Sequence, residues 1–147
     1  MSKYRFRLET LHRLRALHRD QQRAALAEAY QAEQVLADRR ADLASQKSEL
    51  RELQRSAMAG ESMDVNRLIE AQRYEMVLDA GEKQLVEQSL RLAIEVERRR
   101  LAVVEADRSV RALELLDDRQ RREHARQQRR LEVKQLDEVA ITRRPVR

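Results

Sequence analysis

SAMAGESMD, residues 56–64, contains the sole plausible turn in an otherwise helix-forming sequence and therefore decides how the chain folds. Gly60 can adopt the left-handed conformation that ends many helices. Ser62 can cap the following helix, with Asp64 in the first turn of that helix. We therefore predict two helices, at about residues 4–57 and 63–140, joined by a turn at about residues 58–62.

The composition favours long helices over a compact core. Of the 147 residues, 39% are charged and 3% are aromatic, and the chain has two glycines, one proline and no cysteine. These proportions are typical of a coiled coil. The other glycine, Gly81, lies in an apolar stripe that continues from Leu78 to Leu85, so we interpret it as a glycine tolerated inside a helix. We expect one elongated domain without disulfides or thiol chemistry.

Apolar residues recur at heptad spacing on both sides of the turn. Folding at Gly60 and Glu61 would place Leu43 opposite Leu78, as in an antiparallel coiled coil. We therefore predict an all-α fold: a long antiparallel two-helix coiled coil (a hairpin) with the C-terminal helix overhanging. The expected seam consists of Leu8, Leu11, Ala25, Ala29, Ala32, Leu36, Leu43, Leu50 and Leu53 before the turn, and of Leu68, Ala71, Leu78, Leu85, Leu92, Val96, Val103, Val110 and Leu113 after it.

The predicted contact between the two helices ends near Asp117. Beyond it, DRQRREHARQQRRLEVKQLDEVA, residues 118–140, has almost no seam residue before Leu131. Such a polar helix is only marginally stable in isolation. We expect this segment to be a docking element that gains order from a partner.

A second apolar stripe lies on the other side of the second helix. In LRLAIEVERRRLAVVEADRSV, residues 90–110, a rotation of 100° per residue divides the apolar positions between two opposite faces. An exposed apolar row of this length usually marks an interface. The alternatives are a homodimer and the simple burial of the flanks of a broad apolar helix. The outward row consists of Val86, Leu90, Ile94, Leu101, Val104 and Leu115.

The positive charge is concentrated at the two ends of the sequence. Residues 1–23 carry a net charge of +5, residues 24–110 carry −4, and residues 111–147 carry +4. A hairpin would bring the two ends together as one basic pole. Six arginines between Arg119 and Arg130 could hold the phosphates of a nucleic acid. These arginines recur around the whole helix, however, and aromatic platforms are missing, so we expect no nucleic acid as a partner.

The sequence contains no motif that supports catalysis. His12 and His18 are six residues apart, which does not match the i, i+4 spacing of paired metal ligands on a helix, and there is no HExxH motif, P-loop or GxGxxG motif. We therefore expect no enzyme activity, no cofactor and no metal. Neither a membrane-spanning apolar segment nor a signal peptide is present, which predicts a cytoplasmic protein that is not membrane-spanning.

Two short patterns lie at the ends of the sequence. YRFRLETLHRLRALHRDQQRAALAEA contains Phe6, Leu8, Leu11 and Arg15, followed by a helix rich in alanine and glutamine. The other pattern, LEVKQLDEVAITR, begins at Leu131. Together with the chain length, the turn in mid-chain and the overhanging second helix, they resemble the flagellar export protein FliJ family. The stalk proteins of virulence type III secretion systems, an unrelated structural or chaperone coiled coil, and a basic nucleic-acid binder are the alternatives.

The resemblance implies a part in bacterial flagellum biogenesis, flagellar protein export and type III secretion, and through them in motility and chemotaxis. Members of the family are similar in fold to the central stalk of rotary ATP synthases. Their paired ends enter the hexameric export ATPase and promote its assembly and activity. The family also binds the cytoplasmic domain of the export gate and export chaperones, in the cytoplasm and in peripheral association with the inner-membrane export apparatus. We also consider a second copy of this chain as a partner, in a weak homodimer.

The resemblance also suggests where the partners bind. Tyr30 and Tyr74 are the aromatic candidates for contact with the gate, because isolated tyrosines on a polar surface are enriched at interfaces, although packing beside the seam explains them equally well. The residues expected to face the ATPase are Arg5, Phe6, Leu8, Leu11, Arg13 and Leu14 near the start, and Arg122, Arg126, Arg130, Leu131, Leu136, Val139 and Ile141 near the end. The candidates for a second interface are Tyr30, Tyr74, Leu90, Ile94, Leu101 and Val104.

Overall fold

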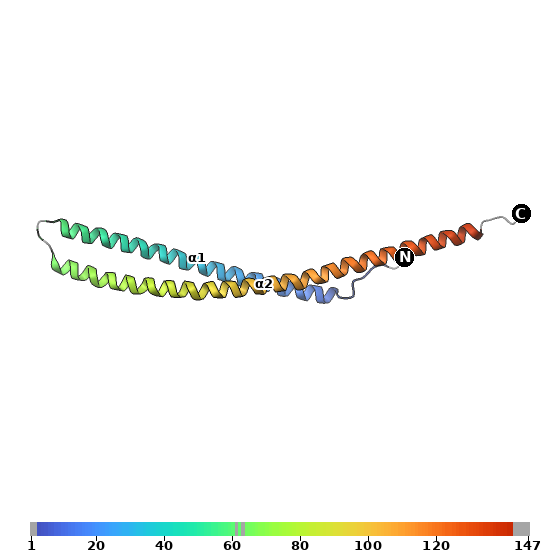
Figure 1. Ribbon diagram of the computed structural model, residues 1–147, viewed down its shortest axis with the longest axis horizontal. Helices are drawn as coiled ribbons and strands as arrows, with labels where there is room; N and C mark the ends of the chain where they lie inside the picture. Colours follow the sequence, from blue (N-terminus) through green and yellow to red (C-terminus); the bar gives the residue numbers. More distant parts are fainter. Residues whose placement is uncertain (1–2, 61, 63, 143–147) are drawn as a thin grey trace. The chain divides into compact units, whose positions relative to one another are not determined.

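Two long helices make up nearly all of the structure. The computed structural model describes residues 3–60, 62 and 64–142. Helix α1 comprises Glu9–Ala59 and helix α2 comprises Val65–Thr142 (Figure 1). There is no β-strand among the described residues. The predicted all-α fold is therefore confirmed.

Helix α1 begins later than the sequence indicated. Residues 3–6 are not helical and residues 7–8 form a turn, so that the helix begins at Glu9 and not near residue 4. The Glu9 N–H donates to the Phe6 carbonyl at 3.4 Å, which closes the turn before the helix. Apolar periodicity continues through this segment in the sequence, but Tyr4 has a side-chain partner on α2, as shown below, that competes with helical geometry.

The turn between the helices also differs from the prediction. Helix α1 continues to Ala59, and no described residue, Gly60 included, has a positive φ, so the expected left-handed conformation of Gly60 is wrong. Asp64, not Ser62, caps α2, because its Oδ1 accepts a hydrogen bond from the Arg67 N–H at 3.3 Å. Glu61, which the prediction also placed in the turn, lies outside the described residues.

The chain divides into two compact units, each of which contains a part of both helices. The middle unit is Arg23–Ala102, and the terminal unit consists of Met1–Gln22 and Val103–Arg147. In the middle unit Lys47 contacts Asp79, and Gln54 contacts Glu75, so the helices run antiparallel.

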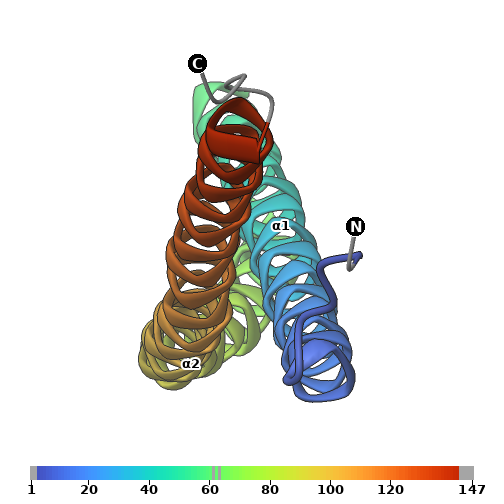
Figure 2. The ribbon, with the colours of Figure 1, turned by 90° about the vertical axis from the view of Figure 1, so that its right-hand side faces the viewer.

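The terminal unit has the same antiparallel order. His12 lies next to Glu114, and Tyr4, which precedes it in sequence, contacts Asp117, which follows Glu114. Figures 1 and 2 show residues 3–8 as the dark-blue coil that precedes α1. Both units therefore confirm the antiparallel helical hairpin.

The buried core is thin. In the middle unit Ala29, Leu50 and Leu78 are buried, and in the terminal unit Ala106 and Val110 are buried. The predicted seam of α2 is confirmed, since all nine of its residues are buried or half-buried. Most of the remaining stabilisation must come from half-buried apolar side chains distributed along the whole length of the contact.

The predicted seam of α1 is only partly correct. Ala29, Leu36, Leu43 and Leu50 face α2, as expected. Leu53, by contrast, is 66% exposed. Leu8, Leu11 and Ala32 are also classed as exposed, whereas Glu33, Lys47 and Gln54 occupy half-buried positions.

The register of the two helices explains this difference. A Cβ on Gly81 would lie 3.9 Å from Leu43 Cδ1, so Leu43 lies next to Gly81 and not simply opposite Leu78. The shift is about half a heptad. Because α1 continues to Ala59 and the Asp64 cap delays the start of α2, the turn is centred later than expected. The shifted register turns the row that contains Lys47 towards α2 in place of the row that contains Leu53.

Charged side chains stabilise the contact where apolar residues are missing. Lys47, whose side chain is 18% exposed, contacts the carboxylates of Asp79, at 2.7 Å, and Glu82. Hydrogen bonds to these two carboxylates raise the pKa of the Lys47 ammonium above its ordinary value. Arg99 donates to the carbonyl oxygen of Ala25 at 2.5 Å and thereby joins the two helices by a side-chain to backbone bond.

Replacing Gly81 by alanine should stabilise the protein. The added Cβ would make an ordinary van der Waals contact with Leu43, and alanine has a higher helix propensity than glycine. We expect Gly81→Ala to raise the free energy of unfolding by about 1 kcal/mol. Urea unfolding followed by circular dichroism measures the change. The matched control, Ala80→Gly on the exposed side of α2, should lower it by a similar amount; equal stability of the two variants would contradict the packing described for Gly81.

Asp64 should control the order of the first turn of α2. Asp64→Ala removes the acceptor of the Arg67 N–H, whereas Asp64→Asn keeps an oxygen at the same place. Hydrogen exchange at the Arg67 amide should be several times faster in the alanine variant and nearly unchanged in the asparagine variant. If Ser62→Ala, and not Asp64→Ala, accelerates exchange, the assignment of the cap is wrong.

Candidate functional site

Tyr4 attaches the start of the chain to α2 within the terminal unit. Its phenol donates a hydrogen bond to Asp117 Oδ1 at 2.7 Å and lies 3.3 Å from the Asp117 carbonyl oxygen. The Tyr4 ring also packs against His124, with the ring centroids 5.6 Å apart. The guanidinium carbon of Arg121 lies 5.8 Å from the centroid of the Tyr4 ring. We refer to Tyr4, Asp117, Arg121 and His124 as the tyrosine clasp.

The clasp depends on the helical spacing of its α2 residues. Asp117, Arg121 and His124 lie at i, i+4 and i+7 and therefore share one face of the helix. Arg121 Nη2 donates to Asp117 Oδ2 at 2.9 Å, so the carboxylate accepts one bond from the phenol and another from the guanidinium. Partial burial, together with the hydrogen bond to Asp117, raises the pKa of the Tyr4 phenol to about 12. The phenol thus keeps its proton and acts as a donor at physiological pH.

The clasp brings several predicted residues of the first end close to α2. Phe6 is half-buried and Arg5 is exposed, and both line a hollow beside α2. The hollow also contains His12, whose Nε2 lies 3.8 Å from Glu114 Oε1. Of the other residues predicted at this end, Leu8 and Leu11 are each 37% exposed, Leu14 is 59% exposed, and Arg13 pairs with Glu9 at 2.9 Å.

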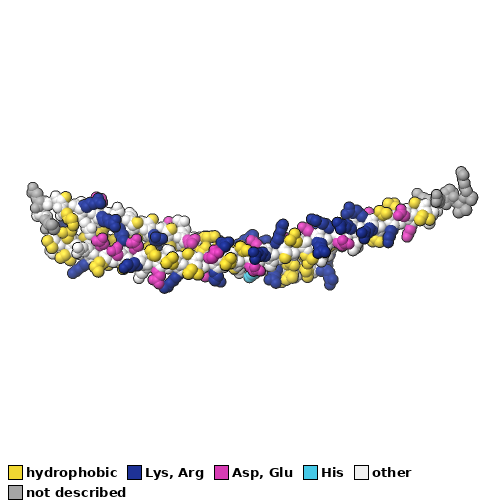
Figure 3. Space-filling view, viewed as in Figure 1, with side chains coloured by type: hydrophobic (Ala, Val, Ile, Leu, Met, Phe, Trp, Pro, Cys, Tyr) yellow, Lys and Arg dark blue, Asp and Glu magenta, His cyan; other side chains and the backbone are white. Residues whose placement is uncertain are grey.

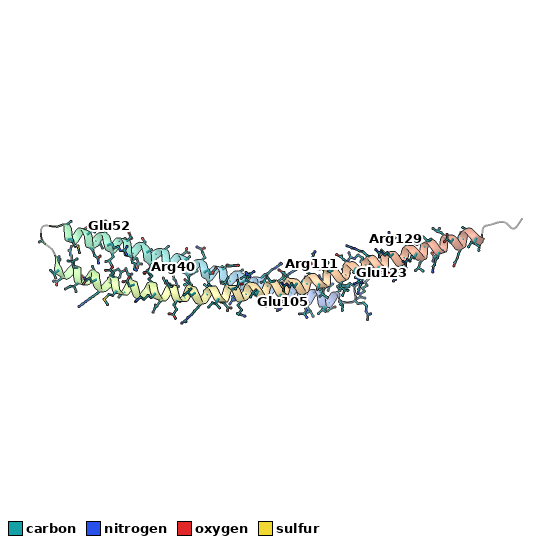
Figure 4. The ribbon with its side chains drawn as sticks, in the orientation of Figure 1. Arg40, Glu52, Glu105, Arg111, Glu123 and Arg129 are labelled. Carbon is teal, nitrogen blue, oxygen red and sulfur yellow. The ribbon has the colours of Figure 1, made fainter. Side chains whose placement is uncertain are left out.

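The predicted residues of the other end lie on a part of α2 that α1 does not cover. After His124, every described side chain except that of Gln128 is exposed. The apolar candidates Leu131, Leu136, Val139 and Ile141 are 49–73% exposed. Figure 4 labels Glu123 and Arg129 near the start of this segment, and Figure 3 shows lysine and arginine side chains gathered there. The predicted overhang of α2 is therefore confirmed, and we call residues 125–142 the overhang.

The outward apolar row of α2 is confirmed except at one position. In the middle unit Val86, Leu90, Ile94 and Leu101 are 40–73% exposed. Val104 is half-buried, so its predicted outward position is wrong. Val104 directly follows Val103, which belongs to the seam, so it lies at the border of the contact face and not on the opposite side of the helix.

The structure does not bring the two candidate tyrosines together. Tyr30 and Tyr74 are each 48% exposed. The contact of Arg99 with Ala25 places Tyr30 close to residue 95 of α2, whereas the contact of Gln54 with Glu75 places Tyr74 close to residue 54 of α1. Because a helix rises about 1.5 Å per residue, the two tyrosines are about 30 Å apart along the middle unit and cannot form one patch.

The sequence pattern does not predict the tyrosine clasp. Tyr4 is one of only four aromatic residues, three tyrosines and one phenylalanine, and its place in the sequence indicates only a helix. The signal that could have found the clasp is the face formed by Asp117, Arg121 and His124, which combines an acceptor, a cation and a ring at helical spacing. Such a face needs a partner side chain, and an aromatic hydroxyl near the other end of a hairpin is a suitable one.

The described residues show neither of the two other kinds of site that we considered. They contain no group of three or more histidine, cysteine, aspartate or glutamate side chains that could hold a metal ion. In the same part of the chain, neither helix has a segment that is both long enough and apolar enough to span a membrane.

These features define a coiled-coil protein that presents exposed arginine and apolar side chains from an uncovered helix. The family model of the flagellar FliJ protein matches residues 3–144, almost the whole chain, and the chain therefore belongs to the FliJ family. The chain is therefore a stalk-type protein of flagellar, or type III, protein export. No curated protein and no solved structure gave a significant match.

Removing the Tyr4 hydroxyl should release the first residues of the chain from α2. A phenol whose pKa is raised on folding contributes stability that is present below pH 10.0 and is lost as the pH rises through about 12. Titration of tyrosinate by ultraviolet absorbance should therefore show a component near pH 12 that is absent from Tyr4→Phe. Trypsin should also cleave after Arg5 and Arg7 faster in this variant.

Tyr30→Phe is the matched control for the clasp, because it removes a phenol from an exposed position in the middle unit. It should keep the component near pH 12 and the slow cleavage after Arg5. A pH titration in which both variants behave alike would contradict the clasp.

Proposed function

We propose that the chain acts as the stalk of the export ATPase, with the overhang and the clasped first residues inside the central hole of the ATPase hexamer. The observation that carries the proposal is the overhang itself. It presents exposed leucine, valine and isoleucine side chains and is covered by no residue of α1 that the structure describes. A helix with these properties gains packing and order when a partner surrounds it.

The mechanism follows from asymmetry. A helical hairpin has no sixfold symmetry, so it contacts the identical subunits of a hexameric ring unequally and favours different nucleotide states in different subunits. As a ligand that binds only the assembled ring, it also shifts the equilibrium towards the hexamer by mass action. The chain would thus stimulate ATP hydrolysis without catalysing it.

The remaining surfaces suit the other proposed partners. We assign the cytoplasmic domain of the export gate, and export chaperones after they release their cargo, to the middle unit, where Tyr30, Tyr74 and the row from Val86 to Leu101 are exposed. The protein would act in the cytoplasm, in peripheral association with the inner-membrane export apparatus, and would support motility and chemotaxis through flagellum assembly. The alternative to these partners is a weak homodimer in which the same apolar row binds a second copy of the chain.

Removal of the overhang tests the proposal. A chain that ends at His124 keeps the tyrosine clasp and all the described contacts between α1 and α2, but it lacks the exposed apolar side chains of the overhang. We expect it to remain helical and to lose stimulation of the export ATPase of the same organism. The measurement is the rate of ATP hydrolysis against the concentration of the added chain, together with the mass of the complex.

Substitutions in the outward row provide the matched control. Leu90→Ser and Ile94→Ser remove exposed apolar side chains from the middle unit, and ATPase stimulation should be unchanged. Full stimulation by the chain that ends at His124 would refute the proposed role of the overhang.

A further inference from the structure

From residue 87 onward, the arginines of α2 fall into two groups that differ in their partners. Between residues 87 and 114, every arginine lies within 4.0 Å of a carboxylate, and most of these carboxylates are one turn away on the same helix. Examples are Arg91 with Glu87 and Arg100 with Glu97. From residue 119 to residue 130 there are also six arginines, but only Arg121 has a carboxylate partner among the described residues.

Four of these six arginines carry unbalanced charge. Arg121 pairs with Asp117, and Arg129 donates to the carbonyl oxygen of Ala125 at 3.3 Å. The other four have exposed side chains and make no hydrogen bond or ion pair with any residue that the structure describes; they are Arg119, Arg122, Arg126 and Arg130. We call these four residues the arginine stripe.

The helical spacing of the four arginines in the arginine stripe places them on one face of α2. These residues are three, four and four positions apart, so they lie within about 80° of one another around the axis and span about 16 Å along it. The tyrosine clasp lies about 180° away, on the opposite side of the same helix. This arrangement corrects the expectation that the basic residues are spread around the whole helix: Arg121 is turned towards Tyr4, and the four arginines of the stripe share the other face with only two acidic residues, Asp118 and Glu123.

The surroundings of the stripe indicate the chemistry of its partner. Like charges at i, i+4 repel one another. Asp118 and Glu123 line the same hollow as three of the stripe arginines, but neither makes an ion pair with them, and Glu123 accepts a hydrogen bond from Gln127 Nε2 at 3.5 Å. Guanidinium groups at intervals of about one turn match carboxylates that repeat at the same interval, each of which can accept two hydrogen bonds. Leu115 and Val133, which are exposed, lie near the two ends of the stripe. Arginine bordered by apolar side chains is characteristic of protein interfaces.

Two other polyanions fit this face less well. A helix that lies on anionic lipid needs an apolar face opposite its basic face, but the opposite face here is the clasp, with Asp117, Arg121 and His124. A nucleic-acid site that binds single strands needs aromatic residues for stacking, but the ring of Tyr4 is packed against His124 on the other side, and Phe6 lines the hollow on that same side together with Tyr4.

We propose that the arginine stripe docks on an acidic protein surface, a row of carboxylates spaced about one helical turn apart, and that this surface belongs to the ATPase subunits. The inference rests on the proposed function and adds the chemistry of the contact. The overhang provides apolar packing, while the stripe determines how far the chain enters the ring and which way it is rotated. The clasp keeps the first residues of the chain off the stripe face.

Charge removal in the full chain tests this inference. The first variant replaces Arg119, Arg122, Arg126 and Arg130 by glutamine. The matched control makes the same change in net charge at Arg91, Arg98, Arg100 and Arg108, which are ion-paired on the same helix. Binding to the export ATPase of the same organism is measured over a range of salt concentrations. Circular dichroism checks that both variants keep the helicity of the wild type.

The stripe variant should bind the ATPase about a hundredfold more weakly, since each exposed arginine–carboxylate pair contributes roughly threefold and there are four of them. Its binding should also depend less on salt than that of the wild type. The control variant should bind within about threefold of the wild type.

The possible failures are distinguishable. If the wild type binds the ATPase and the stripe variant binds equally well, the stripe inference is overturned and the proposed function stands. If the wild type does not bind the ATPase, the proposed function fails and the stripe inference fails with it. Loss of binding to duplex DNA or to phosphatidylglycerol vesicles in the stripe variant, with ATPase affinity unchanged, would assign the stripe to another polyanion and would also overturn the inference.

Discussion

The unequal length of the two helices is the constraint on which the rest of this structure depends. Helix α1 has 51 residues and helix α2 has 78, so an antiparallel pairing that starts from their common turn must leave part of α2 without a partner. A helix satisfies its own backbone hydrogen bonds, but its side chains then face water or another molecule. The sequence accordingly changes from apolar and ion-paired residues in the contact region to free arginines and scattered apolar residues in the overhang. Structure and composition thus agree on which segment is uncovered, and this is the segment that we propose meets the ATPase.

A thin core makes electrostatic pairing more important than in a compact protein. Glu95 accepts hydrogen bonds from Arg98 and Arg99, which lower the pKa of its carboxyl group to about 2, and Lys47 is held between two carboxylates of α2. A carboxyl group with a lowered pKa contributes stability that is present above pH 4.5 and is lost as the pH falls through about 2. The pairs of Glu95 lie within α2, whereas the contacts of Lys47 join α1 to α2 and help to fix which residues of α1 face α2; Leu50 and Leu78 supply apolar burial. The four arginines of the arginine stripe, by contrast, have no such partner among the residues that the structure describes.

Much of the fold could be predicted from the sequence because heptad spacing is a repeated signal. The row containing Leu78 and Val110 was predicted correctly, since an error at one position of a repeat is corrected by the others. The register of the two helices depends on a single turn. Because Asp64 and not Ser62 caps α2, the observed pairing of α1 with α2 differs from the predicted pairing by about half a heptad. Leu53 was consequently placed in the seam although it is exposed. The clasp could not be found by periodicity, because Tyr4 and Asp117 are 113 positions apart and the contact exists only after the chain has folded back.

The central claim is that the overhang of α2 lies inside the ring of the export ATPase, and the structure of the complex tests it most directly. Electron cryomicroscopy of the ATPase hexamer assembled with the full chain should show one helical hairpin per ring. The account predicts that residues 125–142 lie in the central hole, that the turn near Asp64 points away from the ring, and that carboxylates of the ATPase face the arginine stripe. A complex in which the overhang lies outside the ring, or in which the turn enters it, would contradict the account.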